Sequence, residues 1–400
     1  MPERTVAYWR LLSERLPLLF LALAIAPIAG CWDREEVNGL AIVTSVGLDR
    51  KESGAVEMTL EIIVPKQEDG SRAQSGSQPG GGGQTIVRSA EGETAADAVS
   101  KLQAKLPRTI YWGQLEMLVV GEKLARAGFR EQLDYLVRDN EVRLRVQPFV
   151  FGGSVRDFFA SGYSLEQTKA DFLGGEAARL FPKPMTMNRL IQKMTDETED
   201  AVVPLINLSR DGKETAPYIK GYAVLSEGRM AGEMDEEAFS GTKWVLEQLH
   251  RDIETVKLEA SPPLVSLMVM SAKTRLIPHL KGDRPAMEIR IETELSIIQN
   301  TTPYALADPE YIRKTEKAEA EHIRRKVELA VERAQKMKSD VFGFGEAINR
   351  SRPREWNRMK ARWKQVFPSL EVEVAVRVNV RRIGMNNEPV GRTPKTGESR

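Results

Sequence analysis

The spacing of apolar residues along most of the chain predicts strands that alternate with short helices. Apolar and polar positions alternate, as in strands with one buried face, over residues 40–48, 56–64, 287–295 and 372–380. Short apolar runs predict further strands over residues 115–120, 145–151, 202–208, 218–225 and 264–270. Helical spacing covers residues 94–106, 129–137, 165–180, 186–198 and 239–249. Together these elements predict an α+β protein with mixed α/β character, not a doubly wound fold.

The longest predicted helix spans residues 309–338, with Asp308 as its N-cap and Pro309 in its first turn. Its apolar stripe repeats at spacings of four and three, through Ile323, Val327, Ala330, Ala334, Met337 and Val341. Such a stripe can be a seam for a partner helix. Packing on the sheet of its own domain is the commoner arrangement and is favoured here. His322 lies on the charged part of this helix, where we expect it to be solvated.

Residues 70–83 are rich in Gly, Ser and Gln and predict a flexible loop. The run Gly80–Gly83 lacks the Lys-Ser/Thr pair that follows the glycines of a phosphate-binding loop.

The N-terminal 30 residues have the pattern of a bacterial lipoprotein signal peptide. A short apolar segment, residues 16–26, follows a flank with three arginines and leads to Ala29-Gly30-Cys31. The predicted cleavage lies between Gly30 and Cys31. The thiol of Cys31, the only cysteine, would then carry a diacylglyceryl group. Two acyl chains would hold the mature protein on the outer leaflet, whereas one chain binds only reversibly.

Two other interpretations of this segment fit its residues less well. An uncleaved membrane helix would need about 20 apolar residues, and this run is shorter and contains Pro17 and Pro27. Cys31 could also be a free thiol in a domain cleaved elsewhere. A lone cysteine excludes a disulfide within the chain, so lipidation best explains both its isolation and its position.

Composition limits the function classes. The net charge is +1, and basic and acidic residues become equal in number once residues 1–30 are removed. No global basic field therefore exists to bind nucleic acid. Hydrophobic residues make up 41% of the 400-residue chain, which suits two or three domains, with one boundary near residue 200.

The sequence contains no recognisable catalytic or metal-binding set. His250, His279 and His322 do not have metal-ligand spacing, and neither a His-Glu-x-x-His nor a Gly-x-Ser-x-Gly motif occurs. Asp139-Asn140-Glu141 lacks the remaining positions of a calcium loop and predicts a turn. We expect no enzyme activity, no metal and no cofactor beyond the lipid on Cys31, and ligand-binding residues cannot be assigned from sequence.

Four groups of residues resemble the Ger(x)C lipoproteins, the C subunits of bacterial nutrient germinant receptors. The first group is Cys31–Asn38 with Leu40-Ala41 and Gly47–Asp49, and the second is Trp112–Gln114 with Leu133–Asp139 and Glu141–Arg143. The third is Lys220–Val224 with Gly241–Trp244. The last and most specific is Asp340–Glu346 with Pro353, Trp356, Trp363, Phe367-Pro368 and Arg381–Gly384.

For this last group a structural role is favoured over a ligand pocket. Gly343 and Gly345 would allow a tight bend, and Trp356 and Trp363 would fill the core beneath residues 372–380.

The resemblance implies about three successive mixed α/β domains outside the cell membrane, on the inner membrane of the dormant spore. Combined with the hydrophobic pattern, it predicts domains over residues 31–200, 201–260 and 261–385 and a tail over 386–400. It also implies assembly with integral-membrane A and B subunits to trigger germination. The alternative is an extracytoplasmic solute-binding lipoprotein of a transporter, although the sequence does not suggest two matching lobes.

Overall fold

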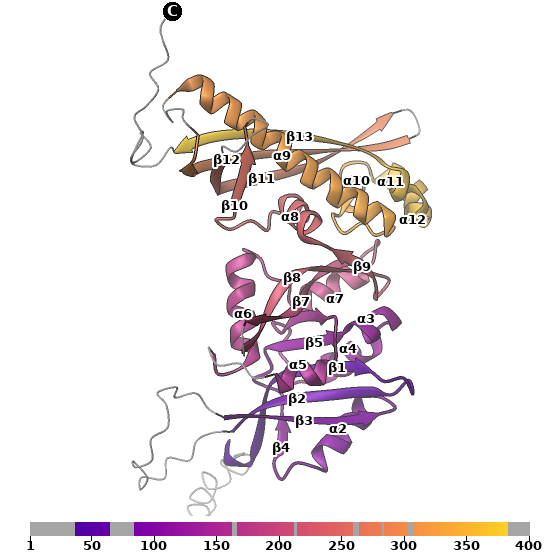
Figure 1. The fold of residues 1–400 in the computed structure, drawn as a ribbon. Coiled ribbons are helices and arrows are strands. Elements are labelled where there is room, and N and C mark those ends of the chain that lie inside the picture. The colour runs from indigo at the N-terminus through magenta and orange to yellow at the C-terminus, as the bar shows by residue number, and fades with distance from the viewer. Residues whose placement is uncertain are drawn as a thin grey trace, which may run out of the picture.

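The computed structural model describes residues 37–64, 84–161, 166–211, 214–258, 264–281, 284–302 and 308–382. Gly30, Cys31, the glycine-rich segment 70–83 and the tail 386–400 lie outside these ranges. Two β-sheets dominate the described part of the molecule, one toward each end in Figure 1. The mixed α/β class predicted from the sequence is confirmed.

The larger sheet has nine strands in the order β3-β2-β1-β5-β6-β7-β8-β9, and β4 pairs with β1. Strands β1, β4, β5, β6 and β7 run parallel, and antiparallel pairs flank them on both sides. The strands are β1 (Leu40–Arg50), β2 (Val56–Val64), β3 (Gln84–Gly92), β4 (Thr109–Tyr111), β5 (Met117–Gly121), β6 (Gln147–Phe151), β7 (Asp200–Asp211), β8 (Glu214–Ser226) and β9 (Arg229–Met234).

Helices cover both faces of this sheet. They are α2 (Ala95–Gln103), α3 (Glu122–Ala127), α4 (Arg130–Arg138), α5 (Val155–Ala160), α6 (Lys169–Leu180) and α7 (Met187–Thr195), and the single turn η2 (Val37–Gly39) precedes β1. Buried residues of α2, α4 and α7 share one hydrophobic core, and those of α5 and α6 belong to the other. The N-caps Thr94 and Thr186 each accept a hydrogen bond from a backbone N–H three residues later, which explains where α2 and α7 begin.

The prediction of a half-buried first strand is wrong, because β1 is buried along nearly its whole length. The polar face of its neighbour β2 is buried as well, and Glu61 is only 2% exposed. Its Oε2 accepts a hydrogen bond from Ser45 Oγ at 2.7 Å, and its Oε1 accepts one from the backbone N–H of Lys169, at the start of α6. Helices distant in sequence therefore cover a face that alternation alone would leave exposed.

The smaller sheet has the order β10-β11-β12-β13, and the long helix α9 (Pro309–Lys336) lies along it (Figure 1). Its strands are β10 (Ile253–Lys257), β11 (Leu264–Lys281), β12 (Arg284–Asn300) and β13 (Glu371–Arg382). The remaining elements are α8 (Glu236–Val245), α10 (Phe344–Ser351), α11 (Pro353–Met359), η3 (Lys360–Arg362), α12 (Trp363–Val366) and η4 (Phe367–Ser369). In the predicted stripe of α9, Ile323, Val327, Ala330 and Ala334 are fully buried. Packing of this stripe within its own chain is thus confirmed.

The predicted boundary at residue 200 falls inside the larger sheet. Strand β7 begins at Asp200 and pairs with β6 through Val150 and Leu205, and β8 and β9 extend the same sheet to Met234. The change from one sheet to the other lies between β9 and β10, where α8 connects them.

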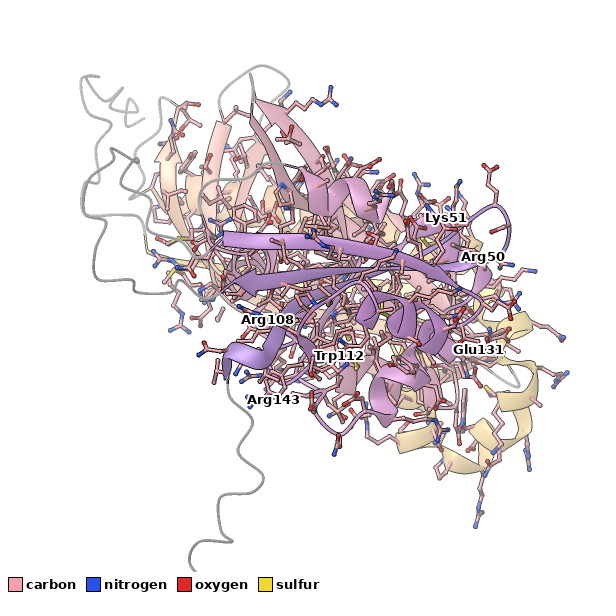
Figure 2. All side chains as sticks on the ribbon, turned by 90° about the horizontal axis from the view of Figure 1, so that it is seen from below. Arg50, Lys51, Arg108, Trp112, Glu131 and Arg143 are labelled. Carbon is pink, nitrogen blue, oxygen red and sulfur yellow. The ribbon has the colours of Figure 1, made fainter. Side chains whose placement is uncertain are left out.

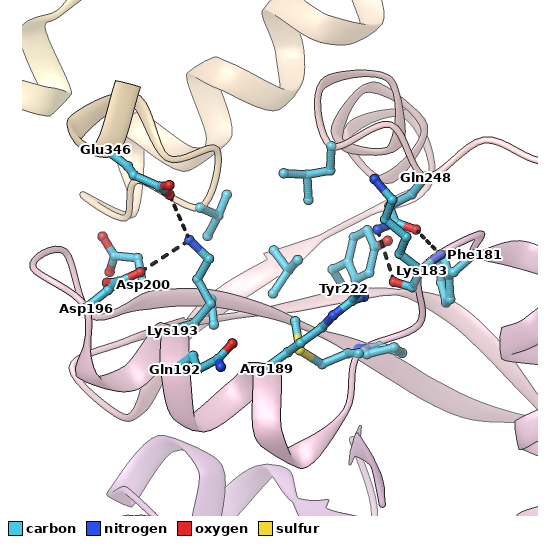
Figure 3. A pocket seen from close by; sticks show the side chains of 16 residues that line it. Phe181, Lys183, Arg189, Gln192, Lys193, Asp196, Asp200, Tyr222, Gln248 and Glu346 are labelled. Carbon is cyan, nitrogen blue, oxygen red and sulfur yellow. Dashed lines mark hydrogen bonds and ion pairs between the residues drawn. The ribbon is translucent and has the colours of Figure 1, made fainter. Parts of the chain in front are cut away.

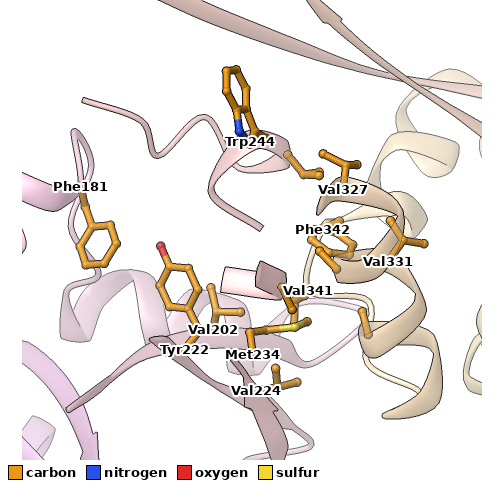
Figure 4. Close-up of a cluster of buried hydrophobic side chains, with 14 of the residues drawn as sticks. Phe181, Val202, Tyr222, Val224, Met234, Trp244, Val327, Val331, Val341 and Phe342 are labelled. Atoms are coloured by element: carbon orange, nitrogen blue, oxygen red, sulfur yellow. The ribbon is translucent and has the colours of Figure 1, made fainter. Parts of the chain in front are cut away.

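One hydrophobic core joins the two sheets. Figure 4 shows Tyr222 and Val224 of β8 facing Trp244 of α8 and Val327 of α9, with Phe342 between the two groups. Helices α8 and α9 pack closely at Gly241. A Cβ on this residue would lie 2.0 Å from the carbonyl oxygen of Lys326. Glycine at this position therefore permits the contact between the two helices.

Candidate functional site

The candidate site is the joint, which we define as the turn Asp340–Glu346 together with the residues of the larger sheet that it contacts. The turn follows α9 and brings the most specific sequence motif into the middle of the molecule. Gly343 has a φ of +78°, the left-handed conformation that glycine adopts at little cost. A Cβ on Gly345 would lie 2.6 Å from the ring of Trp356, so the indole packs directly on the backbone. The predicted tight bend is confirmed.

The carboxylate of Asp340 organises this turn. It is 2% exposed and accepts three hydrogen bonds, from Phe344 N at 2.9 Å, Gly345 N at 2.7 Å and Trp363 Nε1 at 3.0 Å. The first two satisfy backbone donors at the start of α10, and the third fixes the indole of Trp363. Asp340 thus couples a helix N-terminus to the aromatic core formed by Trp356, Trp363 and Phe367.

A second aspartate ties the turn to the larger sheet. The backbone N–H of Asp340 donates to Oδ2 of Asp200, the first residue of β7, at 2.7 Å. Ser339 Oγ donates to the carbonyl oxygen of Leu225 in β8 at 3.2 Å. Burial, and to a smaller extent the nearby carboxyl of Asp200, raise the pKa of Asp340 to about 7, although the hydrogen bonds from Gly345, Phe344 and Trp363 act to lower it. Burial also raises the pKa of Asp200.

Charged contacts surround this connection. Lys364 Nζ lies 2.8 Å from both Glu227 Oε1 and Ser226 Oγ, at the β8–β9 turn. Trp356 Nε1 donates to Glu197, in the segment before β7. These contacts link the C-terminal helices to the larger sheet from two sides. Of the residues that hold the joint, Asp200, Glu197 and Glu227 were not identified from the sequence, since no local pattern marks them.

A cavity of about 500 Å³ lies beside the joint (Figure 3). Its walls come from α7, from β7 and β8, from the segment after α8 and from the 340–346 turn. Lys193 bridges Asp196 at 3.2 Å and Glu346 at 3.5 Å, which closes one end across the joint. At the other end Gln248 exchanges two hydrogen bonds with the backbone of Lys183.

The other motifs of the resemblance also have structural contacts. Trp112 is buried, and its backbone N–H donates to Glu141 Oε2 at 2.9 Å, so the two parts of the second motif meet near Arg143 (Figure 2). In the third motif, a Cβ on Gly221 would lie 2.3 Å from the carbonyl oxygen of Met234, on the neighbouring strand. The predicted turn at Asp139–Glu141 contains a hydrogen bond from the Glu141 N–H to Asp139 Oδ1.

A buried charged cluster lies under α9. Glu254 of β10 contacts Lys326, His322 and the indole N–H of Trp244. Burial acts to raise the pKa of Glu254, but His322 and Lys326 hold it below its ordinary value. Next to this group, burial and then the charge of Glu254 raise the pKa of Glu319 to about 8, against the opposing charge of Lys326. The expectation that His322 is solvated is wrong, because it faces Glu254.

The three histidines do not meet. His250 is exposed at the end of the α8 segment, His279 lies 3.2 Å from Glu288, and His322 lies 3.5 Å from Glu254. Across the described ranges, no three His, Cys, Asp or Glu side chains are arranged to hold a metal ion. None of the helices in the described part of the chain is both long enough and apolar enough to cross a membrane.

Comparison with known proteins agrees with this architecture. A family model described as "Spore germination protein N-terminal domain" matches residues 33–208, and one described as "Spore germination B3/ GerAC like, C-terminal" matches residues 220–384. The chain is 25% identical over 414 residues to spore germination protein KC of Bacillus subtilis (strain 168), covering 93% of this chain and 96% of that protein. It is 28% identical over 382 residues to the putative spore germination protein YfkR of the same organism, covering 92% and 96%.

The fold is also found in a solved structure. The crystal structure of the GerBC protein matches with a TM-score of 0.56 and 16% identity, covering 86% of this chain and 99% of that one. The architecture is therefore that of a multidomain α+β protein. The two family models place it in the spore germination class. The chain belongs to the Ger(x)C family of spore germination proteins, as its motifs predicted.

Proposed function

We propose that this chain is the lipid-anchored C subunit of a nutrient germinant receptor. In this proposal it has no catalytic activity and acts by assembling with integral-membrane A and B subunits on the inner membrane of the dormant spore. The match of both family models, which together span most of the chain, is the observation that carries the proposal. The joint connects the two sheets through buried hydrogen bonds, which suits a docking role.

The anchor is proposed on the sequence Ala29-Gly30-Cys31. Signal peptidase would cleave after Gly30, and a diacylglyceryl group on the Cys31 sulfur would supply two acyl chains, enough for stable membrane attachment. Val37, six residues further along, begins the described chain and is exposed. Since six extended residues span about 20 Å, the larger sheet would lie close to the membrane surface.

A fractionation experiment tests the anchor. Replacing residues 1–30 by an ordinary secretory signal peptide and introducing Cys31→Ala should move the protein from the detergent fraction to the aqueous fraction. Val37→Ala, with the native N-terminus, is the control and should stay in the detergent fraction. Mass spectrometry of the native protein should find Cys31 as the first residue, with a diacylglyceryl adduct. An unmodified Cys31, or full membrane retention of the secreted Cys31→Ala form, would contradict the anchor.

Assembly needs a separate measurement. Affinity purification of the tagged native chain from spore membranes should recover two integral-membrane subunits in constant ratio. Recovery of the chain alone, under conditions that keep it lipidated, would argue against the receptor role while leaving the anchor intact.

A further inference from the structure

The cavity beside the joint has walls from both halves of the molecule. Val202 and Tyr222 come from the larger sheet and Arg189 from α7, whereas Leu246 follows α8 and Val341 belongs to the 340–346 turn. We propose that this cavity binds a small organic carboxylate with a short apolar body. Such a ligand would contact the larger sheet with α7 on one side, and the segment after α8 with the 340–346 turn on the other. The inference goes beyond the receptor-subunit role and does not depend on the lipid anchor.

Tyr222 supplies the first argument. It is 4% exposed, and its ring stacks on Phe181 at 5.5 Å and meets Phe239 edge-on at 4.9 Å. Its hydroxyl points into the cavity in Figure 3. A tyrosine hydroxyl in this position can donate a hydrogen bond to a ligand. Burial raises the pKa of Tyr222, so the hydroxyl stays neutral and can donate to an anion.

The charges around the cavity supply the second argument. The Lys193 ammonium is already compensated by Asp196 and Glu346. By contrast, Arg189 and Lys183 form no ion pair with any described residue, and Arg189 donates only to the carbonyl oxygen of Pro184, at 3.1 Å. The third carboxyl of the lining, Asp200, accepts the Asp340 N–H and lies near the ammonium of Lys364, so Arg189 and Lys183 are left without a carboxylate partner in the described part of the chain. A guanidinium is well suited to hold a carboxylate through two parallel hydrogen bonds.

The apolar wall limits the rest of the ligand. Val202, Leu246 and Val341 face the interior of the cavity, whose volume of about 500 Å³ lies within the usual range for small-molecule sites. Two polar contacts close its ends. Lys193–Glu346 crosses the joint, and Gln248–Lys183 links the segment after α8 to the segment between α6 and α7. A molecule held between them would pack its apolar part on the valines and leucine and place its carboxylate near Arg189 and Tyr222.

Three probes with one carbon skeleton test the ligand class. Isovalerate carries a carboxylate, isoamyl alcohol a hydroxyl and isoamylamine an ammonium on similar branched bodies. Saturation-transfer NMR titrations of the full chain in detergent should give isovalerate a dissociation constant of about 1 mM or tighter, and the amine should bind at least about 10-fold more weakly. Equal binding of the amine, or no saturable transfer to isovalerate, would overturn the proposal.

Two variants test the residues. Arg189→Gln and Tyr222→Phe should each weaken isovalerate binding about 10-fold, the effect of losing one strong hydrogen bond, about 1.4 kcal/mol. Arg179→Gln, at an exposed position of α6 that does not line the cavity, is the matched control and should bind as the native chain does. Thermal unfolding of all three variants checks that they fold. Unchanged binding in folded Arg189→Gln would refute the site, whereas the fractionation of Cys31→Ala would be unaffected by either result.

Discussion

Asp340→Ala is expected to lower the free energy of unfolding by about 3–6 kcal/mol. The substitution leaves three buried donors, Phe344 N, Gly345 N and Trp363 Nε1, without their acceptor. Each unpaired buried donor costs about 1–3 kcal/mol. Urea unfolding of the full chain, followed by tryptophan fluorescence, measures the change, since Trp356 and Trp363 lie beside the site.

The matched control is Asp308→Ala. Asp308 is also a helix N-cap, and its Oδ1 accepts a hydrogen bond from Glu310 N at 2.8 Å, but it is exposed to solvent. Water can replace that bond, so the expected loss is about 1 kcal/mol. Losses of equal size in the two variants would contradict the central role given to Asp340. A larger loss for Asp340→Ala should come with faster amide hydrogen exchange at Leu225 and Ser226, because the turn would separate from β8.

Local elements were predictable because local rules determine them. The capping threonine before α2, the Asp308-Pro309 start of α9 and the alternating valines of β13 all act within a few residues of the element that they define. The turn containing Gly343 was predicted for the same reason, since glycine adopts the left-handed backbone conformation at little cost, and Gly343 takes it directly before α10.

Contacts between distant segments were not predictable in this way. Alternation along β2 correctly predicted a strand, but Glu57 and Glu61 are buried because α5 and α6, about 100 residues later, cover them. The same reason applies to Asp200, which no motif marks and which becomes important only when the 340–346 turn lies against β7. His322 was misplaced because its partner, Glu254, lies on a strand far away in sequence.

The family motifs gain a physical explanation from the joint. Asp340, Gly345 and Trp363 form one hydrogen-bonded and packed unit, and Gly241 permits α8 to approach α9. These residues connect the sheet nearest to the proposed anchor with the sheet furthest along the chain. A subunit that docks with membrane partners through both sheets would depend on this connection.

Glu319→Gln is expected to stabilise the protein at alkaline pH and to leave it nearly unchanged at acidic pH. Glu319 is fully buried, and both carboxyl oxygens lack hydrogen-bond partners among the described residues. Burial first, and then the charge of Glu254, raise its pKa from 4.5 to about 8, against the opposing charge of Lys326. His322 is the other titratable group of this cluster that contacts Glu254.

The sign follows from proton linkage. Between the ordinary pKa of a glutamate and about 8, the folded state holds the proton and the unfolded state does not. Raising the pH through this window therefore removes stability, and the loss is complete above the folded-state pKa. One pKa unit corresponds to about 1.4 kcal/mol, so the shift of Glu319 limits the loss of folding stability to about 5 kcal/mol. Because the cluster can relax, we expect Glu319→Gln to raise the free energy of unfolding by roughly 2–4 kcal/mol above pH 8.

Denaturation curves over a pH series test this expectation. The native chain should lose stability from about pH 5 to about pH 8, and Glu319→Gln should show a smaller slope because only the contribution of Asp340 and other raised groups remains. Glu328→Gln, at an exposed position of the same helix, is the control and should keep the native slope. Parallel curves for the native chain and Glu319→Gln would mean that Glu319 is ionised in the folded protein, which would require Lys326 to move from Glu254 to Glu319.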